Sequence, residues 1–249
     1  MRIVLVTSEA NYVRDNYRRL LTDLHKRWEH RLVGLVVIRT AGAGLFAKLP
    51  LFWAAGARNL AAILFNNACR AKFSDPFASL HRGGVPVIYT DDINAAETMD
   101  QLHSLNPDLI INARTRCIFS TDALKLPRLG CINIHHGILP YNRGTMCDLW
   151  ALYEGRNPGF TIHEMTPEID KGRILHVHEH TDWHSRDYFR LPYWASPTEA
   201  RALDQVVEQI DAQGRIDGRP NTAPDEQITF RRDPTIRQIR QMRARNIVL

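Results

Sequence analysis

The sequence predicts an α/β fold with a Rossmann-like, mostly parallel sheet, an antiparallel extension and a helical C-terminal tail. Short apolar runs alternate with helical stretches through the N-terminal half, and strands that alternate with helices form parallel sheets with right-handed crossovers. Two strand-like runs then follow each other closely at 160–165 and 173–181, and this short connection favours antiparallel pairing. Beyond a turn-rich connector, the chain ends in a segment with helical periodicity.

Five strands are expected in the N-terminal half. The first lies in the β-branched apolar run at 2–7. After it, Leu20, Leu21 and Leu24 recur at helical spacing, which predicts a helix that buries this leucine face. The predicted strands are 2–7, 32–38, 85–89, 108–112 and 131–135, and the predicted helices among them are 17–28 and 95–105.

The second half begins with a short predicted helix at 147–153, followed by the two antiparallel strands. Ser196 and Pro197 have the form of a helix start, with a capping residue and a proline at the first helical position. We therefore expect a helix from Ser196 to about Asp211, ahead of Gly214.

The last part of the chain is expected to be a connector and one helix. Residues 215–225 are rich in Gly, Pro, Asn and Asp, which is typical of turns. Residues 234–245 are studded with arginines at helical spacing. The sequence thus predicts one large domain over 1–214 and a C-terminal connector with an Arg-rich helix over 215–249.

Composition excludes several classes of protein. With 249 residues, of which 44% are hydrophobic and 24% charged, the chain can bury a core without disulfides. Its four cysteines show no C-x-x-C spacing, which argues against a structural zinc site and for reduced thiols. The N-terminus lacks the form of a signal peptide, and the apolar stretch 41–69 is too interrupted to span a membrane. We expect a cytoplasmic protein with no membrane partner.

The predicted strand at 131–135 carries the chemistry. Asn133 and His135 alternate with apolar residues, so both side chains lie on one face at the carboxyl end of a strand, where open α/β sheets bind ligands. Pro140 and Gly144 support the following turn, and Asp170 lies on a loop between the later strands. An amide, an imidazole and a carboxylate match the needs of acyl transfer to an amine that the substrate supplies.

Several spaced motifs resemble one family. N-I-H-x-G-x-L-P-x-x-R-G at 133–144, W-A-L at 150–152, G-x-T-x-H at 159–163 and D-x-G-x-I-L at 170–175 are similar to the formyltransferases that use N10-formyltetrahydrofolate. The resemblance implies Asn133, His135 and Asp170 as catalytic residues and no metal. It also implies residues that bind the folate on its two sides, namely Arg114, Thr115, Arg116, Cys117, Ile118, Phe119, Glu164 and Ile169.

The resemblance implies a formyltransferase catalytic domain over 1–214, in a small free-standing branch similar to sugar N-formyltransferases. N10-formyltetrahydrofolate would be the co-substrate, and the favoured acceptor is the primary amine of a nucleotide-linked amino sugar. Asn133 and protonated His135 would stabilise the oxygen of the tetrahedral intermediate, and Asp170 would orient His135. Other possible acceptors are glycinamide ribonucleotide, an amino-acid side chain and methionyl-tRNA. A non-formylating dinucleotide-binding protein is the alternative class. We expect no nucleic-acid partner, with a homodimer as one option.

Four further features of the sequence can each be interpreted as structural or as functional. His176, His178 and His180 alternate on one strand face but are spaced poorly for zinc. Residues 42–47 weakly resemble a dinucleotide fingerprint. The apolar stretch 45–65 favours a packed helix or a subunit contact over a membrane anchor. The arginine helix favours docking through Ile236, Ile239 and Met242 over binding to phosphates.

Overall fold

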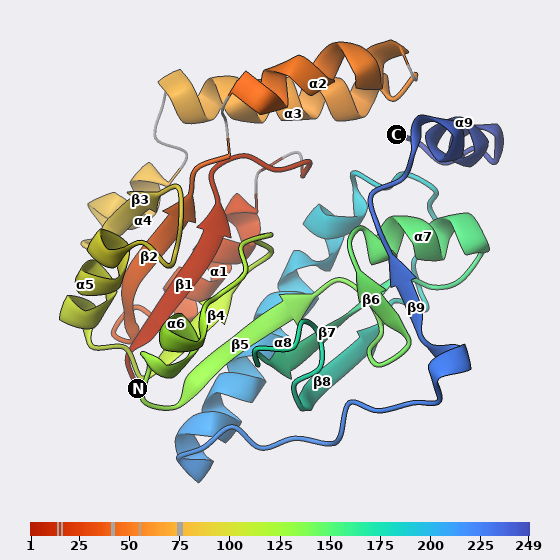
Figure 1. Cartoon of the computed structure of the whole chain (residues 1–249). Coiled ribbons are helices and arrows are strands. Elements are labelled where there is room, and N and C mark those ends of the chain that lie inside the picture. Colours follow the sequence, from red (N-terminus) through yellow and green to blue (C-terminus); the bar gives the residue numbers. More distant parts are fainter. Residues whose placement is uncertain (14, 16, 41–42, 55, 74–76) are drawn as a thin grey trace.

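The computed structural model describes residues 1–13, 15, 17–40, 43–54, 56–73 and 77–249. Its centre is a seven-stranded sheet in the order β3-β2-β1-β4-β5-β7-β8 (Figure 1). The first five strands run parallel, whereas β7 and β8 are antiparallel additions. The strands are β1 (Ile3–Ser8), β2 (Leu32–Ile38), β3 (Val87–Thr90), β4 (Leu109–Asn112), β5 (Gly130–His135), β7 (Gly159–Glu164) and β8 (Ile174–Glu179). The predicted fold class is confirmed.

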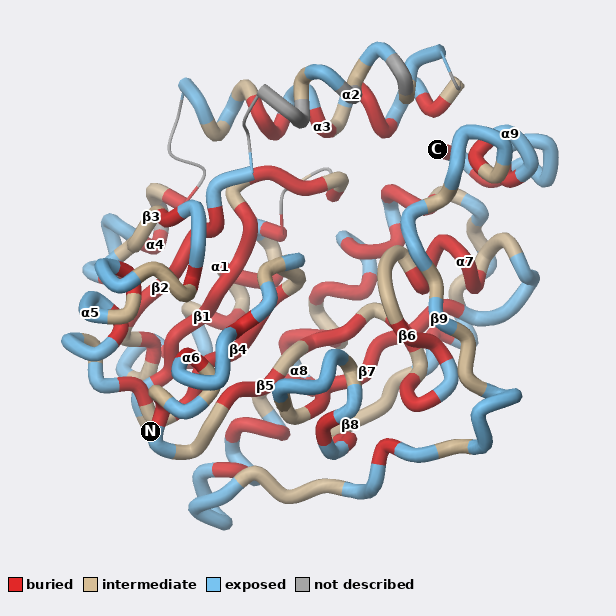
Figure 2. The backbone as a smooth tube through the Cα atoms, in the orientation of Figure 1, coloured by how far each residue is buried: buried red, intermediate tan, exposed pale blue. Residues whose placement is uncertain are grey.

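Helices cover both faces of this sheet. Alternate residues of β1 point to opposite faces, so Leu5 packs in the core with α1 and α8, whereas Val6 packs in the core with α5 and α6. Figure 2 shows β1 and β4, in the middle of the sheet, as continuously buried, whereas the edge strands β3 and β8 are only partly buried. The helices are α1 (Arg18–Arg27), α2 (Ala43–Ala54), α3 (Arg58–Phe73), α4 (Ala78–Arg82), α5 (Ala96–Leu105), α6 (Thr121–Lys125), α7 (Cys147–Glu154), α8 (Leu191–Gln213) and α9 (Ile236–Ala244), with a 3₁₀ turn at Asp225–Gln227.

The long helix α8 begins earlier than the sequence predicts. It starts at Leu191, so Pro197 lies inside the helix and not at its first position. A proline in this place has no N–H for the carbonyl of Tyr193, and that carbonyl instead accepts a hydrogen bond from the Arg19 guanidinium at 3.1 Å. Ser196 does not cap the helix either, because its hydroxyl donates to the Pro192 carbonyl at 2.7 Å. A distant arginine thus makes the internal proline tolerable.

The described elements α4, α6, β6 (Asn142–Gly144) and β9 (Thr229–Arg231) have no counterpart among the predicted strands and helices. A second small sheet pairs β6 in parallel with β9, which brings the C-terminal connector back to the centre of the molecule. The apolar stretch forms a helical hairpin of α2 and α3, whereas the dinucleotide-like motif begins at Gly42, outside the described residues. Among the helices that the structure describes, none is both long and apolar enough to cross a bilayer.

Candidate active site

A cavity of about 360 Å³ opens at the carboxyl ends of β4 and β5. One wall comes from the loop 114–119 after β4, and the opposite wall comes from residues 165–170 after β7. Asn133, His135 and Asp170 all line this cavity, so the structure brings together the three side chains that the sequence singles out. The position agrees with the general rule that open α/β sheets bind ligands beyond the carboxyl ends of their strands.

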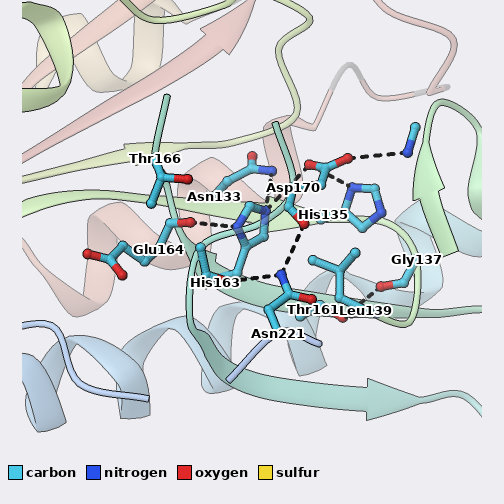
Figure 3. A network of polar contacts seen from close by, with 12 residues as sticks. Asn133, His135, Gly137, Leu139, Thr161, His163, Glu164, Thr166, Asp170 and Asn221 are labelled. Carbon is cyan, nitrogen blue, oxygen red and sulfur yellow. Dashed lines mark hydrogen bonds and ion pairs between the residues drawn. The ribbon is translucent and has the colours of Figure 1, made fainter. Parts of the chain in front are cut away.

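Asn133 is held by a histidine of the neighbouring strand. The antiparallel register of β5 and β7 sets Asn133 opposite His163, and the Asn133 Nδ2 lies 3.1 Å from the His163 Nε2 (Figure 3). Burial lowers the pKa of His163 to about 4, with a further contribution from His135, so His163 is neutral near pH 7. Its Nδ1 donates to the Glu164 carbonyl at 2.7 Å, which leaves Nε2 to accept the Asn133 N–H. His163 therefore fixes the orientation of the Asn133 amide.

His135 lies between two oxygen atoms. Its Nε2 donates to the carbonyl of Asn142 at 2.8 Å, and its Nδ1 lies 3.7 Å from the Asp170 Oδ1. The side chain is 7% exposed. The Nε2 therefore has a hydrogen-bond partner, whereas the Nδ1 faces the Asp170 carboxylate at a distance too long for a hydrogen bond.

Asp170 is positioned mainly by backbone groups. The Gly144 N–H donates to its Oδ2 at 3.2 Å, and its Oδ1 lies 3.7 Å from both His135 and His163. Asp170 itself has a left-handed backbone with φ of 54°, which Asp tolerates better than most residues. Gly144 is required as glycine, because its φ is 96° and a Cβ there would overlap the Arg231 carbonyl of β9. The β6–β9 pairing thus fixes the N–H that holds the carboxylate.

Asn221, from the C-terminal connector, anchors the Asp170 loop through two side-chain hydrogen bonds. Its Nδ2 donates to the carbonyls of Asp170 at 3.0 Å and Gly172 at 2.9 Å, and the residue is buried. We expect Asn221→Ala to lower the free energy of unfolding by about 1–3 kcal/mol, because buried carbonyls lose their partner. Urea unfolding measures this loss. Asn157→Ala is the control, since Asn157 makes an exposed hydrogen bond to Glu179. Equal effects of the two substitutions would contradict the proposed tether.

The residues expected to hold the folate lie mostly on the cavity walls. Arg114, Thr115, Arg116, Cys117, Ile118 and Phe119 form one wall, and Ile169 lies on the other. Glu164, the last residue of β7, is not among the described residues that line the cavity. Its backbone carbonyl instead accepts the His163 N–H. Met165, Thr166 and Phe230 line the cavity too, although the sequence did not single them out.

A second buried polar network reaches the cavity from the other face of β5. Arg114 donates to Glu199 at 2.5 Å and also to the Tyr17 hydroxyl. His136 lies 2.8 Å from Asp148 through Nδ1 and 3.4 Å from Glu199 through Nε2. Glu199 is fully buried and Asp148 nearly so. Arg114 and His136 line the cavity. This network therefore supports the wall that the loop 114–119 forms.

The two buried carboxyls of this network titrate unusually. Burial raises the pKa of Glu199 to about 7 and that of Asp148 to about 6, although Arg114 opposes both shifts. The folded protein therefore holds the Glu199 proton more tightly than the unfolded chain does. This carboxyl stabilises the fold at low pH, and its contribution falls as the pH rises from about 4.5 to about 7.

We expect wild type to lose stability relative to Glu199→Gln over that pH range, since glutamine stays neutral. Thermal unfolding of the two proteins at successive pH values measures the difference. Burial lowers the pKa of His163 and His180 to about 4, and their contributions have the opposite sign. The comparison cancels them because both proteins contain these histidines. Glu208→Gln, an exposed carboxyl on the same helix, is the control. A difference that stays constant with pH would contradict the prediction.

The sequence did not identify His163, Asn221 and Glu199 as site residues. For His163 a signal existed, since the alternation in 160–165 puts Thr161 and His163 on one face of a strand next to β5. His176, His178 and His180 pack around the ring of Phe160, with ring centroids 5.4 to 5.9 Å away. In the described part of the chain, no group of three His, Cys, Asp or Glu side chains is arranged to hold a metal ion.

Comparisons with known proteins agree with this geometry. Residues 70–186 match the family model described as formyl transferase. A methionyl-tRNA formyltransferase from Geobacter metallireducens is 38% identical over 128 residues, which is 51% of this chain and 41% of that protein. The chain spans 14% to 46% of the length of the curated relatives it matches.

Two solved structures share the fold. A sugar N-formyltransferase from a Shewanella species superimposes with a TM-score of 0.56 at 19% identity, over 94% of this chain and 77% of that one. Phosphoribosylglycinamide formyltransferase from Anaplasma phagocytophilum gives 0.59 at 14% identity, over 93% and 98%. The matched segment contains Asn133, His135 and Asp170. The segment 70–186 of this chain therefore carries the similarity to the formyl transferase family.

Proposed function

We propose that this chain is a folate-dependent N-formyltransferase that moves a formyl group from N10-formyltetrahydrofolate to a primary amine. The observation that carries the proposal is the meeting of Asn133, His135 and Asp170 at one end of a cavity. The rest of the cavity suits a flat heterocycle. Ile118, Ile169 and Phe230 contribute apolar side chains to its lining. Residues 115–120 lie in no strand or helix. The Thr115 N–H, the Ile118 carbonyl and the Ser120 N–H already bond to the Asn112 and Asn94 side chains, so a pterin ring would use the other backbone groups of this loop.

The proposed reaction uses these side chains in turn. The acceptor amine attacks the formyl carbon, and the carbonyl oxygen takes on negative charge. The Asn133 N–H that does not contact His163 and the Nδ1–H of His135, whose 3.7 Å distance to Asp170 is too long for a hydrogen bond, stabilise this oxygen, which in other enzymes contributes about 3–4 kcal/mol per donor. The bond from the carbon to N10 then breaks. The proton of the attacking amine passes to N10 with the help of Asp170 and a water molecule, which leaves tetrahydrofolate and a formamide.

We favour a nucleotide-linked amino sugar as the acceptor. Four arginines line the cavity, namely Arg114, Arg116, Arg231 and Arg232. Three of them pair with carboxylates, Arg114 with Glu199, Arg116 with Asp233 and Arg231 with Glu154. Arg232 is therefore the lining residue that we expect to meet a phosphate group of the acceptor. Glycinamide ribonucleotide and methionyl-tRNA carry phosphate as well, and the relatives named above include enzymes for both. The fold similarity covers 94% of this chain for the sugar N-formyltransferase and 93% for the glycinamide ribonucleotide enzyme, so it does not separate these acceptors. Our preference for the sugar rests on the resemblance of the sequence motifs to the small free-standing branch.

An amine panel tests the proposal. The purified chain is incubated with N10-formyltetrahydrofolate and, separately, with nucleotide-linked amino sugars, glycinamide ribonucleotide, ornithine and methionyl-tRNA. We expect release of tetrahydrofolate together with a mass increase of one formyl group on a nucleotide-linked amino sugar. Formylation of another amine would leave the reaction class standing and correct the acceptor. Tight NADH binding, with no folate binding and no formylation, would favour the dinucleotide-binding alternative instead.

Two further parts of the proposal concern the whole chain. Residues 1–214 would form the catalytic domain, while 215–249 would brace it through Asn221 and β9. A cytoplasmic location accords with the four cysteines, all of which are free. A homodimer and the lack of a nucleic-acid partner stay predictions.

A further inference from the structure

The hairpin of α2 and α3 has no part in the proposed reaction. In Figure 1 it lies across one end of the molecule, and α9 lies beside its turn. Leu60 and Leu64 of α3 pack in one buried cluster with Ile239 and Met242 of α9. Figure 2 shows exposed residues along the side of both helices that faces away from the sheet. We call the exposed residues of α2 and α3, together with the exposed arginines of α9, the hairpin surface.

Large aromatic side chains stand out on the hairpin surface. Trp53 is 59% exposed, Phe65 49% and Phe73 79%. The residues around them are also apolar and exposed, namely Ala47, Pro50, Ala54 and Ala62. Of the other exposed large apolar residues, Ile118, Ile169 and Phe230 line the cavity, and Tyr193 and Trp194 lie on α8. A concentration of exposed apolar residues outside a ligand site marks an interaction surface.

The same surface is rich in positive charge. The sequence has no Asp or Glu between Glu29 and Asp75, and none after Asp233. The exposed cations are Arg58 and Lys72 on the hairpin and Arg237, Arg240 and Arg243 on α9. Arg70 of α3 instead lines a cavity together with Asp15 and Asp23. The two groups of exposed cations are continuous, because the Arg243 guanidinium lies against Gly56 at the hairpin turn. Two of the aromatic rings each have a cation beside them. The Arg58 guanidinium lies 4.8 Å from the centroid of the Trp53 ring, and the Lys72 amine lies 5.8 Å from that of the Phe73 ring.

We propose that the hairpin surface docks on an anionic lipid bilayer and lies in its interface without crossing it. Interfacial helices combine Trp and Phe on their apolar side with Lys and Arg on their polar side. Each cation near an anionic leaflet strengthens binding, and the stems of Arg58 and Lys72 can lie on the apolar surface while their charges reach the headgroups. The exposure of the aromatic rings favours this occupant over the packed helix or subunit contact that composition alone indicates.

Two other occupants fit the surface less well. A second copy of the chain across a two-fold axis would bring the same cations face to face, which is unfavourable. Nucleic acid would meet the arginines. However, alanines and Pro50 around Trp53 would gain nothing from phosphates, whereas burial in the interface stabilises them by removing apolar area from water.

Vesicle sedimentation tests the docking. The full chain is mixed with vesicles of phosphatidylcholine alone, or of phosphatidylcholine with an equal amount of phosphatidylglycerol. We expect it to sediment with the anionic vesicles, weakly with the neutral ones, and less at high salt. The triple variant Trp53→Ser, Phe65→Ser, Phe73→Ser should lose binding. Arg237→Gln with Arg240→Gln should lower the partition coefficient about fivefold per cation removed.

Matched controls lie on α8. Tyr193→Ser removes an aromatic ring that is 48% exposed, and Arg201→Gln removes an exposed arginine; both should bind as wild type does. Thermal unfolding confirms that each variant is folded. The docking is refuted if wild type ignores anionic vesicles or if the triple variant binds unchanged. Binding of transfer RNA without vesicle binding would assign the surface to nucleic acid. Self-association lost in the triple variant, again without vesicle binding, would assign it to a second copy.

Discussion

Asp170→Asn is expected to lower kcat for formyl transfer by about 10²–10⁴-fold, the usual contribution of a positioned acid or base group. Asparagine has nearly the same shape and can still accept the Gly144 N–H, which the Asp170 Oδ2 accepts at 3.2 Å. It removes the negative charge that lies 3.7 Å from the His135 Nδ1. The loss should fall on kcat more than on KM, since Asp170 is expected to act on the transition state. Release of tetrahydrofolate from saturating substrates measures it.

Glu168→Gln is the matched control for this experiment. Glu168 lies on the same loop, but its side chain is 68% exposed and pairs with Lys171. We expect its substitution to leave kcat within about twofold, because an exposed ion pair contributes little. Equal loss in both variants would show that the loop, and not the Asp170 charge, matters. Full activity of Asp170→Asn would remove the carboxylate from the mechanism.

Arg114→Met is expected to produce the largest loss of stability, about 3–5 kcal/mol in the free energy of unfolding. Arg114 is 6% exposed and its partner Glu199 is completely buried. Its guanidinium also stacks over the Tyr17 ring, 4.2 Å from the centroid. Methionine can fill much of the space but leaves Glu199 without its cation. Denaturant unfolding near pH 8, where Glu199 with a pKa of about 7 would carry a charge in wild type, measures the full effect.

A second variant separates lost charge pairing from lost packing. Arg114→Met combined with Glu199→Gln should recover part of the stability, because it removes the unpaired carboxylate as well. Arg128→Met is the surface control, since Arg128 is 64% exposed in its pair with Asp108; it should cost about 1 kcal/mol or less. If the double variant were as unstable as the sum of its single substitutions, the loss would come from packing alone.

Periodicity in the sequence predicts the sheet well. The second strand is expected at 32–38 and observed at Leu32–Ile38, because a continuous apolar run between two sheet neighbours has one stable conformation. Local signals fail where a distant residue compensates for them, as Arg19 does for Pro197 in α8. They fail too for β6 and β9, which are three residues each and stable only as a pair.

The candidate site likewise contains residues that local sequence patterns predict and residues that they do not. The shared face of Asn133 and His135 follows from the two-residue period of a strand. The closeness of Asp170 does not follow from periodicity, and only the resemblance to formyltransferases implied it. Local sequence patterns cannot predict the contacts of Asn221 and Glu199. Along the chain, Asn221 lies 51 residues from Asp170, and Glu199 lies 85 residues from Arg114. Contacts at such separation depend on the packing of whole elements.

The central claim is that folate binds beside Asn133, His135 and Asp170. Imidazole resonances of the protein, recorded with and without the non-transferable analogue 5-formyltetrahydrofolate, test it most directly. His135 and His163 have ring centroids 6.2 Å apart at the cavity, and we expect both signals to shift with the analogue. His30 and His103, which lie outside the cavity lining, should not shift. Shifts confined to these distant histidines, or no shift at saturating analogue, would contradict the account.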